Sequence, residues 1–320
     1  MGMTCTSDRP ARHRRAVVFA CDEGYLPYAL FAISRIAALH PERDFDICLC
    51  TGVSPVDIPA SLAHLDIRLC QVDVGDMFEG LRLDPGRSPD VYLRLALPQA
   101  LGADYERILY LDSDIHVQGG DFSALLSVDL GGRPLGAVRD NTQWRTPSRR
   151  PAQFRVLGLP VARYFNAGVL LMDVPRYLEA DLLARCVALG RAEAGRMIRH
   201  DQNLYNAVLQ GDWAELSPAW NWQYTWASRF FEAMQTAHVV HFIGKRKPWK
   251  DAEGELPPRF AREMGAFLAR HWPDRPPVPV GPGPAHDARL MRKHLLKHLV
   301  AAPAMARYLA RFPDDLTVRA

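Results

Sequence analysis

The stretch LYLDSDIHV, residues 109–117, joins an apolar run to two carboxylates that are two residues apart. The run from Arg107 to Leu111 predicts a buried strand, and Asp112 and Asp114 follow at its carboxyl end. Residues two apart on an extended segment point to the same side, so these charges repel unless a cation lies between them. A divalent cation that prefers oxygen ligands, such as Mn²⁺ or Mg²⁺, satisfies both carboxylates and leaves positions for phosphate.

A second interpretation of this pair is a phosphatase with an aspartyl nucleophile. That chemistry needs a hydroxyl residue, a lysine and another acidic pair further along the chain. His116 stands where a hydroxyl or small residue is expected, and the only later adjacent acidic pair, Asp314-Asp315, lies in the tail. The sequence therefore favours the metal site.

Strands and helices alternate on both sides of this stretch. Further strands are predicted at 15–21, 45–50, 67–72, 135–138, 165–172 and near 238–242, and helices at 24–39, from Ser54 toward Leu65, at 90–101, from Asp201, at 257–271 and at 286–311. This alternation predicts an α/β fold with a mostly parallel central sheet flanked by helices. Because ligands gather beyond the carboxyl ends of such strands, functional residues should follow Cys21, Leu111 and Met172.

The composition is that of a folded globular protein, with 48% hydrophobic and 23% charged residues in a chain of 320. No apolar run approaches the roughly 20 residues that cross a bilayer. Residues 1–15 carry a net charge of +3 and residues 284–320 carry +4, so the body between them is mildly acidic. A nucleic-acid-binding domain would carry its basic stripe on the fold itself, and we therefore expect no nucleic-acid partner.

These patterns divide the chain into four segments. We predict a basic N-terminal extension at 1–14, one α/β domain at 15–272, a proline-rich spacer at 273–284 and a basic amphipathic helical tail at 285–320. The tail predicts peripheral contact with an anionic membrane surface. None of the six cysteines forms a C-x-x-C pair and 16–20 is too short for a signal peptide, so we expect reduced thiols and a cytoplasmic location, at the inner face of the membrane.

Polar residues gather in three further segments. HFIGKRKPW, residues 241–249, offers an imidazole nitrogen from His241 for the same metal, a glycine that permits close backbone approach, and lysines suited to a diphosphate. Asn166 and Ala167 form a small turn before a buried strand, able to lie against a ligand. Asp201 and Gln202 begin a helix, where an acidic residue is favoured by the helix dipole.

Six segments, in this order, resemble glycosyltransferase family 8. They are FACDEGY (19–25), VYLRL (91–95), LYLDSDIHV (109–117), YFNAGVLLMD (164–173), HDQNLYN (200–206) and HFIGKRKPW (241–249). The resemblance spans about residues 15–250 and is greatest to bacterial lipopolysaccharide α-galactosyl- and α-glucosyltransferases. It implies a GT-A-type fold, a uridine diphosphate hexose donor, Mn²⁺ as cofactor with Mg²⁺ as the alternative, a saccharide or lipid-linked saccharide acceptor, and transfer with retention of configuration.

The resemblance also implies roles for single residues. Asp112, Asp114 and His241 would be the metal ligands. The donor would be bound by Ala20, Asp22, Tyr25, Arg94, Asp112, Asn166, Ala167, Asp201, Gln202, Gly244 and Lys247. Among these, Asp22 would recognise uracil, Tyr25 would stack on it, and Gly244 and Lys247 would contact the diphosphate. Gln202, on the reacting face of the sugar, and Asp201 would be the catalytic residues.

Three positions depart from the family pattern. Gly24, Val91 and His200 stand where a polar residue, a threonine and a glutamine are frequent. None of them removes a metal ligand, so we expect an active enzyme; a catalytically inactive paralogue that binds the sugar nucleotide is the alternative.

Retention requires either an enzyme nucleophile or attack from the side of the leaving group. Gln202 is an amide and a poor nucleophile, which favours front-face attack in which the departing phosphate takes the acceptor proton. Asp201 is the alternative nucleophile. Trp220, Trp222 and Trp226 form an aromatic cluster that is interpreted either as a stacking platform for the acceptor sugar or as part of the core.

Overall fold

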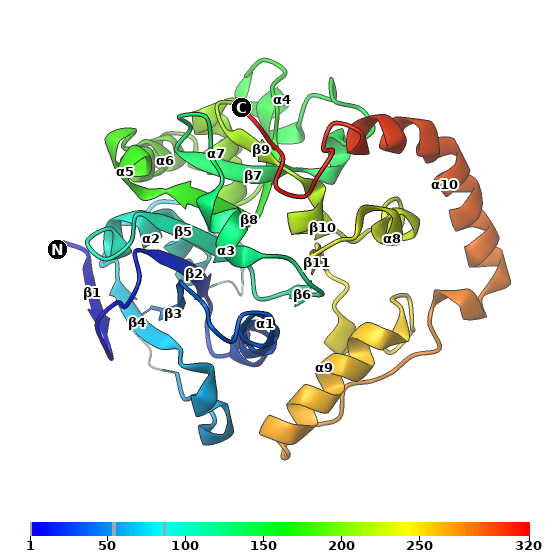
Figure 1. Ribbon diagram of the computed structural model, residues 1–320. Helices are drawn as coiled ribbons and strands as arrows, with labels where there is room; N and C mark the ends of the chain where they lie inside the picture. The colour runs from blue at the N-terminus through cyan, green and yellow to red at the C-terminus, as the bar shows by residue number, and fades with distance from the viewer. Residues whose placement is uncertain (1, 53–55, 86–87) are drawn as a thin grey trace.

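The computed structural model describes residues 2–52, 56–85 and 88–320 (Figure 1). Within these residues the main sheet has nine strands. Their spatial order is β1 (Thr4–Ser7), β4 (Arg68–Asp73), β3 (Asp46–Thr51), β2 (Arg15–Ala20), β5 (Arg107–Leu111), β8 (Phe165–Asp173), β7 (Leu135–Arg139), β9 (Ala214–Leu216) and β12 (Val318–Arg319). The strand predicted in front of the two aspartates, β5, is therefore the centre of the sheet.

The sheet is parallel from β4 to β5, whereas β1 pairs antiparallel with β4 and the other side of β5 is mixed. β4, β3, β2 and β5 run parallel, whereas β8 pairs antiparallel with both β5 and β7. The prediction that functional residues follow Met172 is wrong for this reason. Because β8 runs backwards, the start of β8 rather than its end lies beside the carboxyl end of β5, with Val169 opposite Leu111.

Both faces of the sheet are covered. The helices are α1 (Leu26–Leu39), α2 (Leu93–Leu101), α3 (Phe122–Ser127), α4 (Ala152–Leu157), α5 (Val174–Glu179), α6 (Leu182–Ala192), α7 (Asp201–Leu209), α8 (Glu232–Gln235), α9 (Pro258–His271) and α10 (Ala288–Leu309). Along β2, Val17 and Phe19 enter the core that contains α1, while Ala16 and Val18 enter the core that contains α2 and α6. A strand buried on both faces has no polar side to alternate, which explains its continuous apolar sequence.

Most of the other predicted elements are present with shifted ends. The predicted start of a helix at Ser54 lies outside the described residues, and the part toward Leu65 is the 3-10 helix η1 (Ala60–Leu65). Pro98 lies inside α2 without ending the helix. A second sheet of three strands contains β10 (Trp222–Gln223), β11 (Val239–His241) and β6 (Ile115–Val117), which follows the two aspartates.

The two ends of the chain are parts of the domain. β1, predicted to belong to a separate extension, pairs with the edge strand β4, and β12 pairs with β9 at the opposite edge. In α10, Ala301, Met305 and Tyr308 are buried in the core. Each end of the chain thus adds a strand to one edge of the same sheet. Of residues 273–284, predicted as the spacer, 273–283 contain no helix or strand, and Val278 packs against Gly265 of α9.

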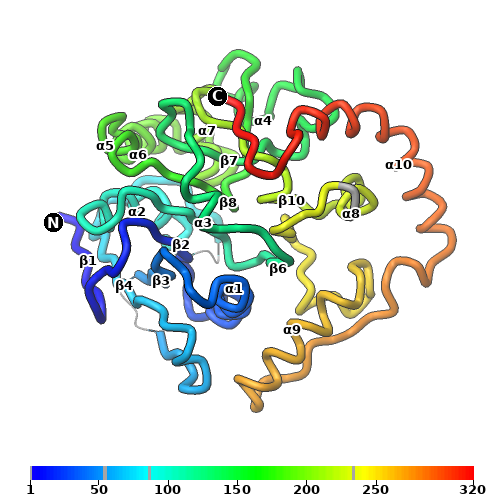
Figure 2. Tube along the Cα trace, viewed as in Figure 1, coloured from blue at the N-terminus to red at the C-terminus, as the bar shows by residue number. Residues whose placement is uncertain are grey.

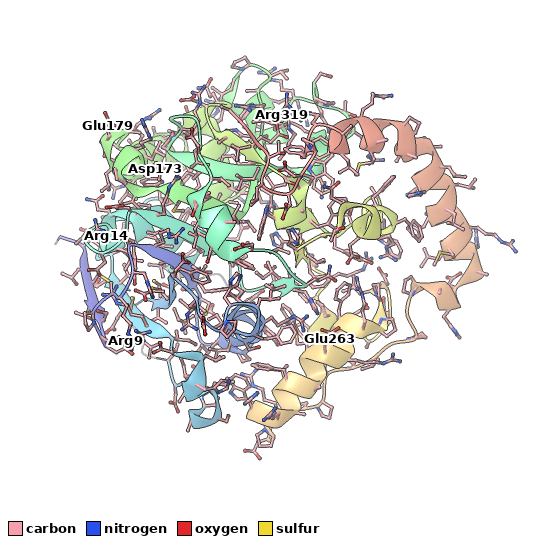
Figure 3. All side chains as sticks on the ribbon, viewed as in Figure 1. Arg9, Arg14, Asp173, Glu179, Glu263 and Arg319 are labelled. Carbon is pink, nitrogen blue, oxygen red and sulfur yellow. The ribbon has the colours of Figure 1, made fainter. Side chains whose placement is uncertain are left out.

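Arg9 and Arg14 of the N-terminal segment lie on the side of the molecule opposite α10 (Figure 3). The arginines of this segment form ion pairs with the body: Arg9 and Arg12 with Asp66, Arg14 with Glu106, and Arg15 with Asp44. The trace in Figure 2 shows α10 arching along the outside of the molecule between α9 and the C-terminus. None of the helices formed by the described residues is long and apolar enough to span a membrane.

Candidate active site

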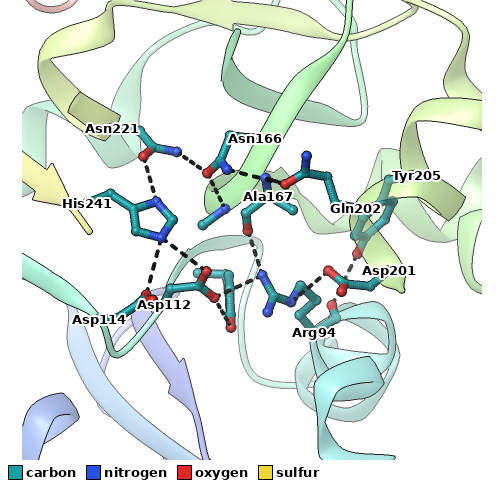
Figure 4. Close-up of polar contacts among 12 residues, drawn as sticks. Arg94, Asp112, Asp114, Asn166, Ala167, Asp201, Gln202, Tyr205, Asn221 and His241 are labelled. Atoms are coloured by element: carbon teal, nitrogen blue, oxygen red, sulfur yellow. Dashed lines mark hydrogen bonds and ion pairs between the residues drawn. The ribbon is translucent and has the colours of Figure 1, made fainter. Parts of the chain in front are cut away.

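Asp112, Asp114 and His241 meet beyond the carboxyl end of β5 (Figure 4). The Nε2 atom of His241 lies 3.2 Å from Oδ1 of Asp114 and 3.7 Å from Oδ2 of Asp112. One candidate ligand atom from each residue lies within 4.8 Å of the other two. No other group of three such residues comes this close in the described parts of the chain.

Strand pairing brings His241 to the aspartates across more than 120 residues of sequence. β11 pairs antiparallel with β6, and His241 stands opposite Ile115, the residue after Asp114. The backbone N–H of Asp112 donates a hydrogen bond of 2.8 Å to the carbonyl oxygen of Gly168 on β8. A Cβ atom at Gly168 would lie 2.2 Å from Cε1 of His241, so glycine is required for this close approach.

Each carboxylate uses one oxygen to bind the protein and directs the other at His241. Oδ1 of Asp112 accepts a hydrogen bond from Tyr110 (2.7 Å) and lies 2.9 Å from Nη1 of Arg94. Oδ2 of Asp114 pairs with the ammonium of Lys247. Burial alone would raise the pKa of Asp114, but His241 and Lys247 outweigh it and hold that pKa below its usual value.

These residues fit a divalent cation. The free oxygens of the two aspartates and Nε2 of His241 face one another, and a set of two carboxylate oxygens and one imidazole nitrogen suits Mn²⁺. Metal ligands must be deprotonated, and the lowered pKa of Asp114 favours the ionised form of that carboxylate. A cation held by these three residues would take its further ligands from elsewhere, such as phosphate oxygens.

Arg94 joins this cluster to the start of α7. Its Nε lies 2.9 Å from Oδ2 of Asp201, its Nη1 donates to the carbonyl of Ala167 at 2.8 Å, and its guanidinium lies 4.6 Å from the ring centroid of Tyr110. Burial raises the pKa of Asp201, and the charge of Arg94 opposes that rise. The structure thus places Arg94, Asp112, Ala167 and Asp201 within one network of polar contacts.

Gln202 is held against the start of β8. Its Oε1 accepts hydrogen bonds from the N–H of Ala167 (3.1 Å) and from Nδ2 of Asn166 (3.3 Å), while its Nε2 lies 3.3 Å from the hydroxyl of Tyr164. All three partners lie at the beginning of the reversed strand or directly before it. The antiparallel direction of β8 therefore brings Asn166, Ala167 and Gln202 to the same edge as the aspartates.

The other predicted donor contacts lie around this edge. Ala20 ends β2, whose Phe19 pairs with Leu111, so Asp22 follows the strand next to β5. Oδ1 of Asp22 accepts from the N–H of Tyr25 (3.1 Å), and both residues are exposed. The turn after β11 contains Gly244, with a φ of +78° that favours glycine and with open space where a Cβ would be.

The aromatic platform is not present. Trp220 and Trp222 are fully buried, so the prediction that they contact an acceptor sugar is wrong and their alternative interpretation as core residues holds. The ring of Trp226 stacks on His294 of α10 at 3.6 Å, and the guanidinium of Arg229 lies 3.7 Å from its centroid. Both groups contact the indole, which stays partly exposed. Burying a large apolar ring stabilises the fold more than leaving it at the surface. The spacing of the tryptophans in the sequence does not show which of them are buried.

Sequence reasoning also missed residues of the site. Tyr110 and Tyr164 belong to segments singled out above, yet their hydroxyl partners, Asp112 and Gln202, follow only from the fold. Asn221 is fully buried, and its Oδ1 lies 3.0 Å from Nδ1 of His241. Nothing in the sequence identified Asn221 as a site residue, because it lies within the tryptophan-rich segment that is interpreted as a stacking platform for the acceptor sugar.

Comparison with known proteins agrees with this geometry. The sequence profile described as Glycosyl transferase family 8 matches residues 16–253. The chain belongs to this family. The GT-A-type fold predicted from the motifs is also confirmed, since the structure is similar to that of galactosyltransferase LgtC in complex with donor and acceptor sugar analogs. That similarity has a TM-score of 0.64 at 24% sequence identity and covers 78% of this chain and 95% of LgtC.

Two sequence relatives are glycosyltransferases of bacteria. Glycosyltransferase GlyF of Streptococcus pneumoniae serotype 4 is 27% identical over 251 residues, which are 74% of this chain and 57% of GlyF. Lipopolysaccharide 1,2-glucosyltransferase of Escherichia coli strain K12 is 28% identical over 169 residues, which are 50% of this chain and 48% of that enzyme. The family 8 chain thus matches about half the length of these two relatives.

Proposed function

We propose that this family 8 chain is a retaining glycosyltransferase that depends on a divalent metal. It would transfer galactose or glucose from a uridine diphosphate sugar to a saccharide or lipid-linked saccharide, in the synthesis of lipopolysaccharide or another surface glycan. The observation that carries the proposal is the cluster of Asp112, Asp114 and His241, joined through Arg94 to Asp201. The name of the Escherichia coli relative, lipopolysaccharide 1,2-glucosyltransferase, supports a lipopolysaccharide acceptor.

The residues of the site suit the two ends of such a donor. A divalent cation bound by the cluster, Mn²⁺ or Mg²⁺, would neutralise charge on the leaving diphosphate. Lys247 already lies at Asp114 and adds a second positive charge there. Asp22 and Tyr25, exposed at the end of the neighbouring strand, would receive the uracil base, while Asn166, Ala167, Arg94 and Gly244 would position the hexose and the diphosphate.

The contacts of Asp201 support front-face attack. Its side chain is 8% exposed and is paired with Arg94, which makes it a poor nucleophile and a good acceptor for a hexose hydroxyl. Gln202 lies beside it with its carbonyl oxygen held by the N–H of Ala167. In this mechanism Gln202 stabilises the developing positive charge at the sugar, and the departing phosphate accepts the proton of the acceptor hydroxyl.

The test is hydrolysis and transfer with a panel of uridine diphosphate sugars, with Mn²⁺, with Mg²⁺ and with EDTA. We expect one hexose donor to be consumed in the presence of metal and not with EDTA, and the rate to rise when an oligosaccharide acceptor is added. Donor binding without any turnover would support the inactive paralogue instead. A glycosyl adduct on Asp201, detected by mass spectrometry, would overturn front-face attack.

We further propose that α10 holds the enzyme on an anionic membrane surface, at the inner face of the cytoplasmic membrane. Its body-facing side carries the buried His294 and Met305, whereas its outer side exposes a cluster of aliphatic side chains. The exposed residues are Leu295 (46%), Leu296 (65%), Leu299 (66%) and Val300 (84%). The basic residues beside them, Arg289, Arg292, Lys293 and Lys297, form no ion pair with the described residues, in contrast to the arginines of the N-terminal segment.

Flotation with anionic and with zwitterionic liposomes tests this surface. Deleting 285–320 is unsuitable because it removes core residues and β12. We expect the triple change Leu296→Glu, Leu299→Glu and Val300→Glu to lower binding to anionic vesicles at least about tenfold, since each buried aliphatic side chain contributes roughly 1.5 kcal/mol or more. Val161→Glu, at an aliphatic residue 52% exposed elsewhere, is the matched control. Equal flotation of the triple variant and the control would refute membrane contact through α10.

A further inference from the structure

Asn221 lies directly behind the candidate metal ligand His241. It ends the 3-10 helix η5 (Pro218–Asn221), is fully buried, and forms two polar contacts through its side chain. Its Oδ1 lies 3.0 Å from Nδ1 of His241, and its Nδ2 donates to Oδ1 of Asn166 at 2.9 Å. Both polar atoms of this buried amide therefore have a partner, as burial demands.

The contacts of Asn166 continue this chain of amides toward the sugar side of the site (Figure 4). Oδ1 of Asn166 also accepts a hydrogen bond of 3.0 Å from the backbone N–H of Gly168. Its Nδ2 donates to Oε1 of Gln202 at 3.3 Å. Three amides, those of Asn221, Asn166 and Gln202, thus form one row that starts at His241.

The direction of every hydrogen bond in the row follows from one atom. The backbone N–H of Gly168 can only donate, so the atom of Asn166 that it contacts is the carbonyl oxygen. Asn221 must then present its NH₂ group to that oxygen and its own carbonyl oxygen to His241. Because that oxygen can only accept, Nδ1 of His241 carries the proton. Nε2, which lies 3.2 Å from Asp114 and 3.7 Å from Asp112, is then the nitrogen that would bind the cation.

We propose that Asn221 is a positioning residue that holds His241 in the metal-binding tautomer and connects that ligand to the Asn166–Gln202 pair. The proposal rests on the proposed function, because it assigns Asn221 to the same metal site. Residues that fix the far nitrogen of a ligating histidine orient its ring, and their substitution typically costs about 10- to 100-fold in metal affinity or activity. The row also makes the orientation of Gln202 depend on Asn221.

Two substitutions separate the two contacts of Asn221. Asn221→Leu removes both of them. Asn221→Asp keeps an oxygen that accepts the proton of Nδ1 but cannot donate to Asn166, since both oxygens of a carboxylate are acceptors. The matched control is Asn203→Leu, at a buried asparagine that bonds Tyr164 and Gln153 and does not contact His241.

The first readout is Mn²⁺ affinity of the folded protein, measured by titration of free Mn²⁺ with electron paramagnetic resonance. We expect Asn221→Leu to weaken Mn²⁺ binding about 10- to 100-fold. We expect Asn221→Asp to bind Mn²⁺ at least as tightly as the parent protein, with kcat of donor hydrolysis lowered about tenfold or more because the Asn166–Gln202 pair has lost its donor. Circular dichroism verifies that each variant is folded. Unchanged Mn²⁺ affinity in Asn221→Leu, or an equal loss in Asn203→Leu, would overturn the proposal.

The second readout needs neither metal nor donor. The ¹⁵N chemical shifts of the imidazole nitrogens, with His241 assigned by comparison with His241→Gln, report which nitrogen is protonated. We expect a protonated Nδ1 in the parent protein, and loss of this preference in Asn221→Leu, where Nδ1 has lost its acceptor. An unprotonated Nδ1 in the parent protein would overturn the inference. If Nδ1 is protonated yet no Mn²⁺ or Mg²⁺ binds, the proposed function fails while the role of Asn221 in fixing the tautomer stands.

Discussion

Asp114→Asn is expected to lower the rate of hexose transfer about a thousandfold. The change replaces one carboxylate oxygen that faces His241 by a neutral amide and leaves Lys247 without its partner. A catalytic metal stabilises the transition state by several kcal/mol, and about 4 kcal/mol corresponds to this factor. The measurement is kcat for hydrolysis of the donor at saturating Mn²⁺, with Mn²⁺ affinity determined separately.

Asp274→Asn is the matched control for this prediction. It makes the same chemical change at an exposed aspartate beyond α9, and we expect it to leave kcat unchanged. The metal assignment would be contradicted if Asp114→Asn retained turnover within a few-fold of the parent protein. It would also be contradicted if Asp114→Asn retained the Mn²⁺ affinity of the parent.

Glu215→Leu is expected to have the largest effect on stability. Glu215 is fully buried on β9 and holds two arginines: Arg139 of β7 through bonds of 2.7 and 2.8 Å, and Arg311, which follows α10, through bonds of 2.8 and 3.1 Å. Removing the carboxylate leaves Arg139 buried without its counterion. Breaking a buried pair in this way costs about 3–5 kcal/mol in the free energy of unfolding, which urea denaturation measures.

Glu106→Leu is the matched control, because Glu106 pairs with Arg14 at the surface, with its side chain 59% exposed. An exposed pair contributes about 0–1 kcal/mol, so this variant should unfold close to the parent protein. An equal loss of unfolding free energy in Glu215→Leu and Glu106→Leu would show that the buried cluster stabilises the fold no more than a surface ion pair does.

The same cluster predicts how stability depends on pH. Burial alone would raise the pKa of Glu215, but its hydrogen bonds to Arg139 and Arg311 outweigh it, and the pKa in the folded protein is lowered. A lowered pKa stabilises the fold above the usual pKa of glutamate, about 4.3. This contribution to the free energy of unfolding is lost as the pH falls below that value and through the lowered pKa. Over the same pH range, the free energy of unfolding of Glu215→Leu should therefore decline less than that of the parent protein.

The strands and the ligand-bearing loops were predictable because their signals are local. The run from Arg107 to Leu111 is apolar on both faces and ends in two carboxylates, a pattern that requires neither partner strands nor distant residues. Asp22 and His241 also follow short apolar strands. The order of the six motifs was enough to predict the family, since it depends on residue types and not on contacts.

The direction of β8 was not predictable from its composition. An apolar strand buried on both faces has the same sequence character whether it runs parallel or antiparallel, so the parallel prediction placed the ligand edge at the wrong end. For the same reason the tryptophans near β10 could be interpreted as either core or platform. Only packing shows that Trp220 and Trp222 are enclosed.

The sequence by itself determined which side chains can hold a cation, because Asp112, Asp114 and His241 carry that chemistry wherever the chain places them. Tertiary structure alone decided how these groups are oriented. The row from Gly168 through Asn166 and Asn221 fixes which nitrogen of His241 donates to Asn221, and Arg311 reaches Glu215 only because the C-terminal segment returns to the sheet. Both depend on contacts between residues far apart in sequence, which the identity of single residues does not encode.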